Sequence, residues 1–186
     1  MFQNLFRRRD DPFALVVGMT GVKMGDRLVQ VGCADAPRLA AIASKVGLSG
    51  RAAAVVGDQE TGARVEKAAS RAGVLVEVTV APPTRVPVED AGFDLAIIDD
   101  TGTAFTQMTD ADKGATVRET VRVLRPGGRV MVIGATPRTG LGAALARQQA
   151  PSADPTPALQ ANGYKTIRVL AERDGMIFYE AMKPRA

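Results

Sequence analysis

Three carboxylates and a glycine directly follow stretches of the sequence that are rich in apolar residues. Gly32 follows RLVQV, Asp58 follows AAAVVG, and Asp99 and Asp100 follow FDLAII. A glycine lets a backbone approach a ligand closely, and carboxylates can bind hydroxyls, amines or a divalent cation, or act as a base. If the three stretches are neighbouring parallel strands, these residues share one edge of a sheet and could form one site.

Each of these residues also has a purely structural interpretation. Gly32 could be only a tight strand-to-helix turn, and Asp58 could be only a helix N-cap. Asp99 and Asp100 could be a solvated strand end. Two adjacent carboxylates indicate a metal only weakly, because Mg²⁺ usually also needs more distant ligands and water. We therefore predict no metal site, and Asp99 is our candidate for orienting a substrate.

The chain has no histidine and one cysteine, Cys33. The lack of histidine excludes Ser-His-Asp and Cys-His triads, HExxH zinc sites and any histidine general base. A single cysteine excludes an intramolecular disulfide and suits a reducing compartment, so we expect the cytoplasm. No neighbouring base is evident, which favours a small packed residue over a reactive thiol at this position.

Composition predicts a globular protein of about one domain. The 186 residues are 46% apolar and 24% charged, which is enough to bury a core. The net charge of +4 names no partner. Only 4% of the residues are aromatic and no basic stripe is interleaved with them, so we expect no nucleic-acid partner. No apolar run approaches the roughly 18 residues that a spanning helix needs, so we expect no integral membrane segment.

The first residues stand apart from the rest of the chain. Residues 7–9 are three arginines, followed by Asp10 and Asp11, with Phe2, Leu5 and Phe6 nearby. They could be a solvated first turn or a short interfacial anchor. We divide the chain into an N-terminal helical segment at residues 1–22 and a domain at residues 23–186.

From residue 27 onward, short apolar runs alternate with amphipathic stretches, a pattern typical of βαβ units around a parallel sheet. Helices are predicted to begin near Asp35, to follow Asp58, and to cover residues 110–124. The RDG turn near the end predicts an antiparallel hairpin, and residues 151–157 are predicted to be a flexible connection. The predicted strands cover residues 27–31, 52–56, 74–80, 93–98, 129–133, 165–171 and 176–182.

This order of elements resembles that of the class I S-adenosylmethionine-dependent methyltransferases. The resemblance is carried by KMGDRLVQVGCADA at residues 23–36, GFDLAIIDD at residues 92–100, RVLRPGGRVMV at residues 122–132, and the closing ANGYKTIRV and GMIFYEAMK. RVLRPGG in particular is similar to the small-molecule branch related to ubiquinone and menaquinone methylation. The resemblance implies a Rossmann-like, doubly wound α/β fold whose seven strands run in the order 3-2-1-4-5-7-6, with strand seven antiparallel.

The resemblance also implies S-adenosylmethionine as cofactor and a small organic molecule as methyl acceptor. Asp99 is then the candidate catalytic residue, and residues 100–109 and 136–157 would form the acceptor pocket. The cofactor-binding residues implied are Gln30, Gly32, Cys33, Ala34, Gly57, Asp58 and Asp99.

The cofactor-contacting positions depart from the family's pattern. The family's first motif reads acid-x-G-x-G-x-G, whereas Gln30 stands here in place of the acid, and Ala34 and Ala36 replace two glycines. Asp58 comes two residues later than the usual ribose-binding acid, and Pro82 aligns with the Asp that usually reaches adenine.

Two hypotheses follow from this pattern. The first is methyl transfer from S-adenosylmethionine to a small acceptor. The second is a methyltransferase-like binding or scaffold protein that kept the fold and lost the cofactor, with a cleft narrowed by Ala34, Ala36 and Pro82. An NAD(P)-dependent dehydrogenase needs GxGxxG after the first strand, and GCADAP has only the first glycine, which disfavours that class.

Overall fold

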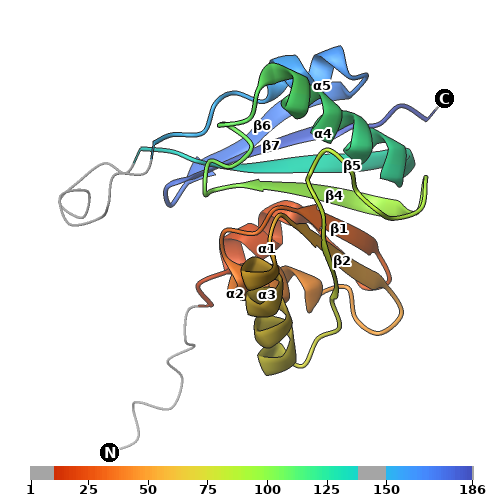
Figure 1. The fold of residues 1–186 in the computed structure, drawn as a ribbon, viewed down its shortest axis with the longest axis vertical. Helices are drawn as coiled ribbons and strands as arrows, with labels where there is room; N and C mark the ends of the chain where they lie inside the picture. Colours follow the sequence, from red (N-terminus) through yellow and green to blue (C-terminus); the bar gives the residue numbers. More distant parts are fainter. Residues whose placement is uncertain (1–10, 138–149, 186) are drawn as a thin grey trace, which may run out of the picture.

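The protein is built around a seven-stranded sheet with helices on both faces (Figure 1). The computed structural model describes residues 11–137 and 150–185. The strand order is β3-β2-β1-β4-β5-β7-β6, and β7 is antiparallel to both β5 and β6. The predicted topology and closing hairpin are therefore confirmed. The strands are β1 (Arg27–Val31), β2 (Arg51–Val56), β3 (Glu77–Val80), β4 (Phe93–Asp100), β5 (Leu124–Ala135), β6 (Lys165–Arg173) and β7 (Met176–Met182).

Several strand ends differ from the prediction, and three of these differences have a cause in the local contacts. The third strand begins at Glu77, because the Val74 amide instead donates to the Ala69 carbonyl and helps to end the preceding helix. The fourth strand continues through Asp99 and Asp100, since β5 is long enough to pair with both. The fifth strand starts at Leu124, and RPGG forms a bulge in it between the pairs Phe93–Leu124 and Leu95–Arg129.

Within the residues that the structure describes, five helices cover the sheet, with α1, α2 and α3 gathered at one end of the view and α4 and α5 at the other (Figure 1). Alternate residues of a strand point to opposite faces, so each strand supplies both layers of the core. Ile97 packs in the cluster that contains Ile42 of α2, whereas Ile98 packs in the cluster that contains Val117 of α4. The helices are α1 (Ala14–Thr20), α2 (Ala36–Ala43), α3 (Gln59–Ala72), α4 (Asp110–Val123) and α5 (Thr156–Ala161).

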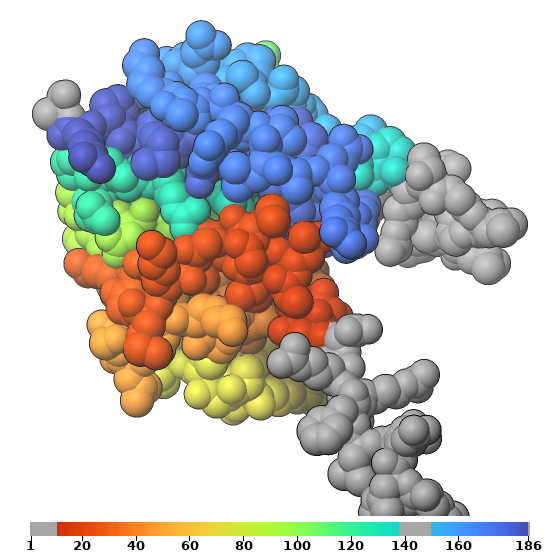
Figure 2. Space-filling view, turned by 180° about the vertical axis from the view of Figure 1, so that it is seen from behind, coloured from red at the N-terminus to blue at the C-terminus, as the bar shows by residue number. Residues whose placement is uncertain are grey.

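Helix α1 contributes to the core of the domain. Val16 is buried in the same cluster as Leu28 and Phe178, and Arg129 donates a hydrogen bond to the Thr20 carbonyl. Figure 2 shows the red N-terminal part of the described chain lying between the orange and the blue parts. The division of the chain at residue 22 stays a prediction. None of the helices within residues 11–137 and 150–185 has the length and apolar character needed to cross a membrane.

The segment predicted to be a flexible connection is instead held to the sheet where the structure describes it. The Ser152 hydroxyl donates to the Asp100 carbonyl at 2.9 Å and accepts from the Ala135 amide at 2.8 Å. Helix α5 then starts at Thr156, and its Leu159 is fully buried. The prediction was wrong because a Pro-Ser-Ala composition does not reveal partners that come from distant strand ends.

The two tyrosines allow a direct test of one side-chain contact between α4 and the segment after α5. Tyr164 is buried, and its hydroxyl lies 3.0 Å from Oγ1 of Thr120 in α4. Burial raises the pKa of the Tyr164 hydroxyl, so it stays protonated at neutral pH. Tyr164→Phe should lower the free energy of unfolding by about 0.5–1.5 kcal/mol, because it leaves the Thr120 hydroxyl without this partner. Urea denaturation measures the change.

Tyr179→Phe is the matched control, because Tyr179 is only partly buried. We expect its free energy of unfolding to stay within about 0.5 kcal/mol of the parent chain. Equal losses in the two variants would contradict the role given to the Tyr164 hydroxyl.

Candidate functional site

Gly32 forms a left-handed turn where β1 ends. Its φ is +76°, and its amide donates to the Val55 carbonyl at 2.9 Å. A Cβ atom at this position would lie 3.2 Å from the Asp99 carbonyl oxygen. Both the backbone angle and this close approach favour glycine. The turn therefore brings the ends of β1 and β4 together, as the sequence predicted.

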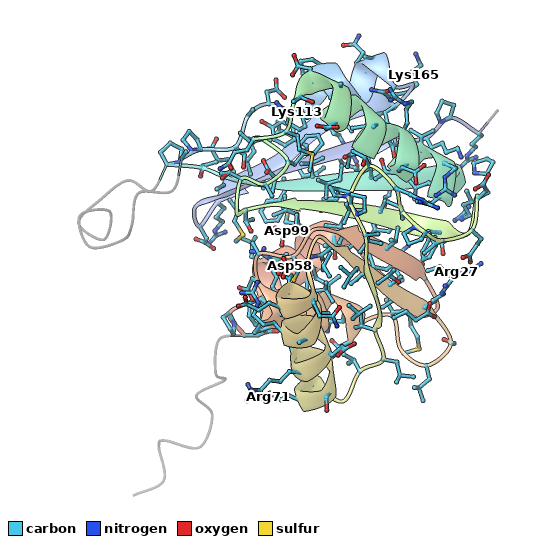
Figure 3. All side chains as sticks on the ribbon, viewed as in Figure 1. Arg27, Asp58, Arg71, Asp99, Lys113 and Lys165 are labelled. Carbon is cyan, nitrogen blue, oxygen red and sulfur yellow. The ribbon has the colours of Figure 1, made fainter. Side chains whose placement is uncertain are left out.

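A cavity of about 430 Å³ opens at the carboxyl ends of β1, β2 and β4. Its volume is within the range of about 300–1,000 Å³ that is usual for small-ligand sites. Figure 3 shows Asp58 and Asp99 on this side of the molecule and Arg27, the first residue of β1, at the opposite end of the sheet. The lining residues predicted from the sequence are Gly32, Cys33, Ala34, Gly57, Asp58 and Asp99.

Gln30 is not among the residues that line this cavity. Its side chain is buried, and Nε2 donates to the Gly32 carbonyl at 3.0 Å. The residue that stands in place of the family's acid therefore supports the turn from within the protein. The structure gives it a structural role in place of the direct cofactor contact that the sequence suggested.

Asp99 is held by a buried ion pair with Arg38, a residue of α2. Nη2 of Arg38 lies 2.8 Å from each carboxylate oxygen of Asp99 and 2.6 Å from Oγ1 of Thr101. The two residues are only 7% and 4% exposed. The interpretation of Asp99 as a solvated strand end is therefore wrong, because α2 packs an arginine against it.

Further donors fill the remaining positions around this carboxylate. Oδ2 accepts from the Ala34 amide at 2.9 Å, and Oδ1 accepts from the amide and the hydroxyl of Thr101 at 3.1 and 2.7 Å. A carboxylate offers roughly four lone-pair positions. With the two contacts from Arg38, the Asp99 carboxylate is saturated by the protein itself.

Asp100 is also buried, on the opposite face of β4. Its carboxylate accepts from the amide and the hydroxyl of Thr106, at 3.0 and 2.6 Å. The Thr106 hydroxyl in turn accepts from the Ala153 amide at 2.7 Å. Asp100 therefore organises the loop that follows β4 and connects it to the segment before α5.

Asp58 caps α3 and also lines the cavity. Its carboxylate accepts from the amide and the hydroxyl of Thr61, at 2.7 and 2.9 Å. These hydrogen bonds lower the pKa of the Asp58 carboxyl, so it is ionised at neutral pH. The two interpretations of Asp58, as helix cap and as ligand acceptor, are compatible, because the carboxylate is exposed and borders the cavity.

Cys33 lines the cavity as a protonated thiol. Burial first, and then the Asp99 carboxylate, raise its pKa to about 12. Only about 10⁻⁴ of the thiol is therefore ionised at pH 8, and only the thiolate reacts as a nucleophile. We expect iodoacetamide to alkylate the native protein at pH 8 more than about a hundredfold slower than free cysteine.

Mass spectrometry follows this alkylation cleanly, since Cys33 is the only cysteine. Because the folded-state pKa is raised, the rate should increase as the pH is raised toward 10. The urea-unfolded chain, in which the thiol is exposed, should react at the rate of free cysteine. A native rate equal to the unfolded rate at pH 8 would contradict a packed, protonated Cys33.

The loop after β4 and helix α4 complete the cavity wall. Their lining residues are Gly102, Ala104, Phe105, Met108 and Thr116. The sequence pointed to this loop only as part of an acceptor pocket, and the second predicted part, residues 136–157, lies partly outside the described residues. The sequence did not point to Arg38 as a residue of the site. The available signal was its position beside Leu39 and Ala40, which are buried.

Two of the three residues expected to narrow the cleft, Ala36 and Pro82, do not line it, whereas Ala34 does. Pro82 is exposed, and the cavity is lined by Pro83 instead. Ala36 lines a second hollow, of about 790 Å³, which lies between α2 and α3 and whose lining includes no strand residue. The smaller cavity is the better candidate site, because it lies at the switch point of the sheet where open α/β folds bind ligands.

Comparison with known proteins agrees with this geometry. A model of the methyltransferase domain family matches residues 28–128, which is more than half of the chain, and the chain belongs to that family. Together with the strand order, this match defines a class I S-adenosylmethionine-dependent methyltransferase domain. No curated protein matches the chain.

Several solved structures share the fold at low sequence identity. A SAM-dependent methyltransferase from Aquifex aeolicus is 19% identical, with a TM-score of 0.71, and the match covers 92% of this chain and 89% of that one. A SAM-dependent O-methyltransferase from Thermotoga maritima is 17% identical, with a TM-score of 0.67 and coverages of 92% and 64%. The [4+2]-cyclase SpnF is 18% identical, with a TM-score of 0.68 and coverages of 94% and 80%.

Proposed function

We propose that this protein binds S-adenosylmethionine in the cavity at the ends of β1, β2 and β4 and transfers its methyl group to a small organic acceptor. The observation that carries the proposal is the open cavity of about 430 Å³ at the switch point of a methyltransferase-family sheet. The resemblance to the quinone-methylating branch favours an acceptor of that general kind. We propose the cytoplasm as the compartment, on the evidence of the single cysteine.

The nucleoside end of the cofactor fits the residues that are present. Asp58 is an ionised, exposed carboxylate beside the cavity and can accept hydrogen bonds from ribose hydroxyls. Phe105 and Met108 offer apolar contact surface to an adenine ring. The Gly32 turn lets the backbone approach the ligand without a side chain in the way.

The amino-acid end fits less well. Strand order places Asp99 of β4 across Gly32 from Asp58, so the cofactor's ammonium group would lie toward Asp99. That carboxylate is already saturated by Arg38, Thr101 and Ala34. The catalytic role of Asp99 stays a prediction, and its contacts favour a structural role over that of a base.

Methyl transfer does not require a general base in this site. A bound S-adenosylmethionine supplies an electrophilic methyl group, so the protein has to align the acceptor and exclude water. Phe105, which is buried, and Met108 provide an apolar wall for that purpose. The absence of histidine from the chain is therefore compatible with the proposed reaction.

A second candidate function is a binding or scaffold protein that carries out no methyl transfer. The buried Arg38–Asp99 pair favours it, because Arg38 already binds the Asp99 carboxylate that would hold the amino-acid end of the cofactor. This protein would bind adenosine-type ligands, or a partner, without turnover.

Isothermal titration calorimetry with S-adenosylhomocysteine tests the proposed function. We expect saturable binding to the full chain, and no detectable binding at millimolar ligand would exclude a methyltransferase. Binding without methyl transfer from labelled S-adenosylmethionine, across a panel of small phenols, quinols and carboxylic acids, would favour the second candidate.

Asp58→Asn sharpens this test. Asparagine caps a helix about as well as aspartate, so α3 should remain intact and the melting temperature should stay near that of the parent chain. Affinity for S-adenosylhomocysteine should fall about tenfold if the carboxylate binds ribose hydroxyls, as for loss of one charge-assisted hydrogen bond. Unchanged affinity would restrict Asp58 to its role as helix cap.

A further inference from the structure

We infer that Arg38 is a specificity-determining residue, because its guanidinium competes with a ligand's ammonium group for the Asp99 carboxylate. The inference rests on the proposed binding of an adenosyl compound in the cavity. It concerns whether the cavity prefers adenosyl compounds with or without an amino-acid end. It depends on contacts that the sequence did not reveal.

The first argument is the position of the ion pair. Asp99 lines the cavity, whereas Arg38 is not among the lining residues and reaches the carboxylate from α2, behind the cavity wall. Strand order β2-β1-β4 gives a bound adenosyl compound one path, from Asp58 across Gly32 to Asp99. The ion pair therefore lies where the amino-acid end of the ligand would bind.

The second argument is the saturation of Asp99. Its two oxygens accept five hydrogen bonds from Arg38, Thr101 and Ala34. An ammonium group that needs an acceptor there has to displace Arg38, whose side chain is only 9% exposed. The displaced guanidinium would then need another buried partner, and its neighbouring contact is a thioether, Sδ of Met176, at 3.9 Å.

The charge balance leads to the same conclusion. Within the cavity lining, Asp58 and Asp99 are the two carboxylates, and Arg38 already neutralises Asp99. At the Asp99 end of the cavity, a ligand without a cationic group meets a preformed, neutral ion pair, whereas a ligand with an ammonium group must break this buried pair, which is costly. The cavity should therefore bind adenosyl thioethers that lack the amino-acid end about as tightly as those that carry it.

Two adenosyl thioethers provide the test. S-adenosylhomocysteine carries an α-amino acid end, and 5′-methylthioadenosine has the same nucleoside and sulfur without it. Calorimetry on the full chain should give S-adenosylhomocysteine an affinity no more than about threefold above that of 5′-methylthioadenosine. A larger preference in the parent chain would overturn the inference, and this measurement needs no variant.

Arg38→Met then leaves Asp99 available to a ligand cation. We expect its preference for S-adenosylhomocysteine over 5′-methylthioadenosine to rise at least fivefold relative to the parent chain. A smaller rise would overturn the inference. A fall would do so as well, since it would mean that Arg38 binds the ligand's carboxylate.

Two further variants serve as controls. Arg38→Met combined with Asp99→Asn removes the charge that attracts the ammonium group, so the preference should return toward that of the parent chain. Arg71→Met removes an arginine from α3, far along the helix from Asp58, and should leave the preference unchanged.

The two proposals fail in different ways. Binding of both ligands with a preference that Arg38→Met does not raise overturns only the role of Arg38. Binding of 5′-methylthioadenosine alone supports that role and excludes the methyltransferase proposal. No binding of either ligand at millimolar concentration overturns both.

Discussion

Arg38→Met is expected to lower the free energy of unfolding by about 3–5 kcal/mol, the usual cost of removing one partner of a buried ion pair. Asp99 is 4% exposed and receives two of its five hydrogen bonds from this arginine. Without Arg38, the carboxylate keeps its contacts with Ala34 and Thr101 but has no counter-charge. Urea denaturation of the ligand-free protein measures the loss.

A double-mutant cycle separates the ion pair from the packing of the arginine stem. Asp99→Asn in the Arg38→Met background removes the uncompensated charge, so the double variant should be more stable than Arg38→Met alone. The coupling free energy should be at least about 1 kcal/mol, as for residues in direct contact. Additive effects of the two substitutions would contradict the ion pair.

Arg173→Met is the matched control for the arginine-to-methionine change. The Arg173 side chain is 74% exposed and lies 3.9 Å from an exposed Asp174. Exposed ion pairs contribute little, so the free energy of unfolding should change by less than about 0.5 kcal/mol. A loss as large as that of Arg38→Met would mean that the substitution itself, and not burial of the pair, is responsible.

Gly32→Ala is expected to weaken both the fold and ligand binding. The residue has a φ of +76°, and an alanine Cβ would lie 3.2 Å from the Asp99 carbonyl oxygen. The left-handed backbone alone costs about 1–2 kcal/mol for a residue with a side chain. The turn must also shift away from β4, and affinity for an adenosyl ligand should fall about tenfold or more because this turn forms the cavity wall.

Gly57→Ala controls for adding a methyl group to the same cavity. Gly57 lines the cavity, but its φ is not positive and a Cβ there would meet no atom within 4 Å. We expect its free energy of unfolding to stay within about 0.5 kcal/mol of the parent chain. Similar losses of stability in the two variants would contradict the conformational argument for Gly32, and calorimetry with 5′-methylthioadenosine gives the binding comparison.

Local patterns in the sequence determined the fold. The apolar run before Gly32 gave the first strand with its observed bounds, and the RDG turn gave the antiparallel pair at the end of the chain. These features could be predicted because a strand or a turn is encoded within a few consecutive residues. The ends of β4 and β5 could not, because each strand continues only as far as its neighbour offers hydrogen bonds.

The candidate site was also predicted only in part from the sequence. The sequence placed Gly32, Asp58 and Asp99 at one edge of a parallel sheet, and the structure brings all three to one cavity. The roles of Gln30 and Asp58 rest on contacts within three residues along the chain. Periodicity and turn chemistry were therefore sufficient to predict that Gly32, Asp58 and Asp99 lie together, and the binding of a ligand there stays a prediction.

Only the tertiary structure decided the state of Asp99. Arg38 lies 61 positions away in the sequence, and it reaches the carboxylate because α2 packs on the face of the sheet toward which Asp99 points. A sequence pattern shows which side chains are buried, but a buried charge finds its partner only when two distant elements pack together. The sequence thus determined where this protein could bind a ligand, and the packing of α2 against β4 decided that Asp99 already has a cation of the protein's own.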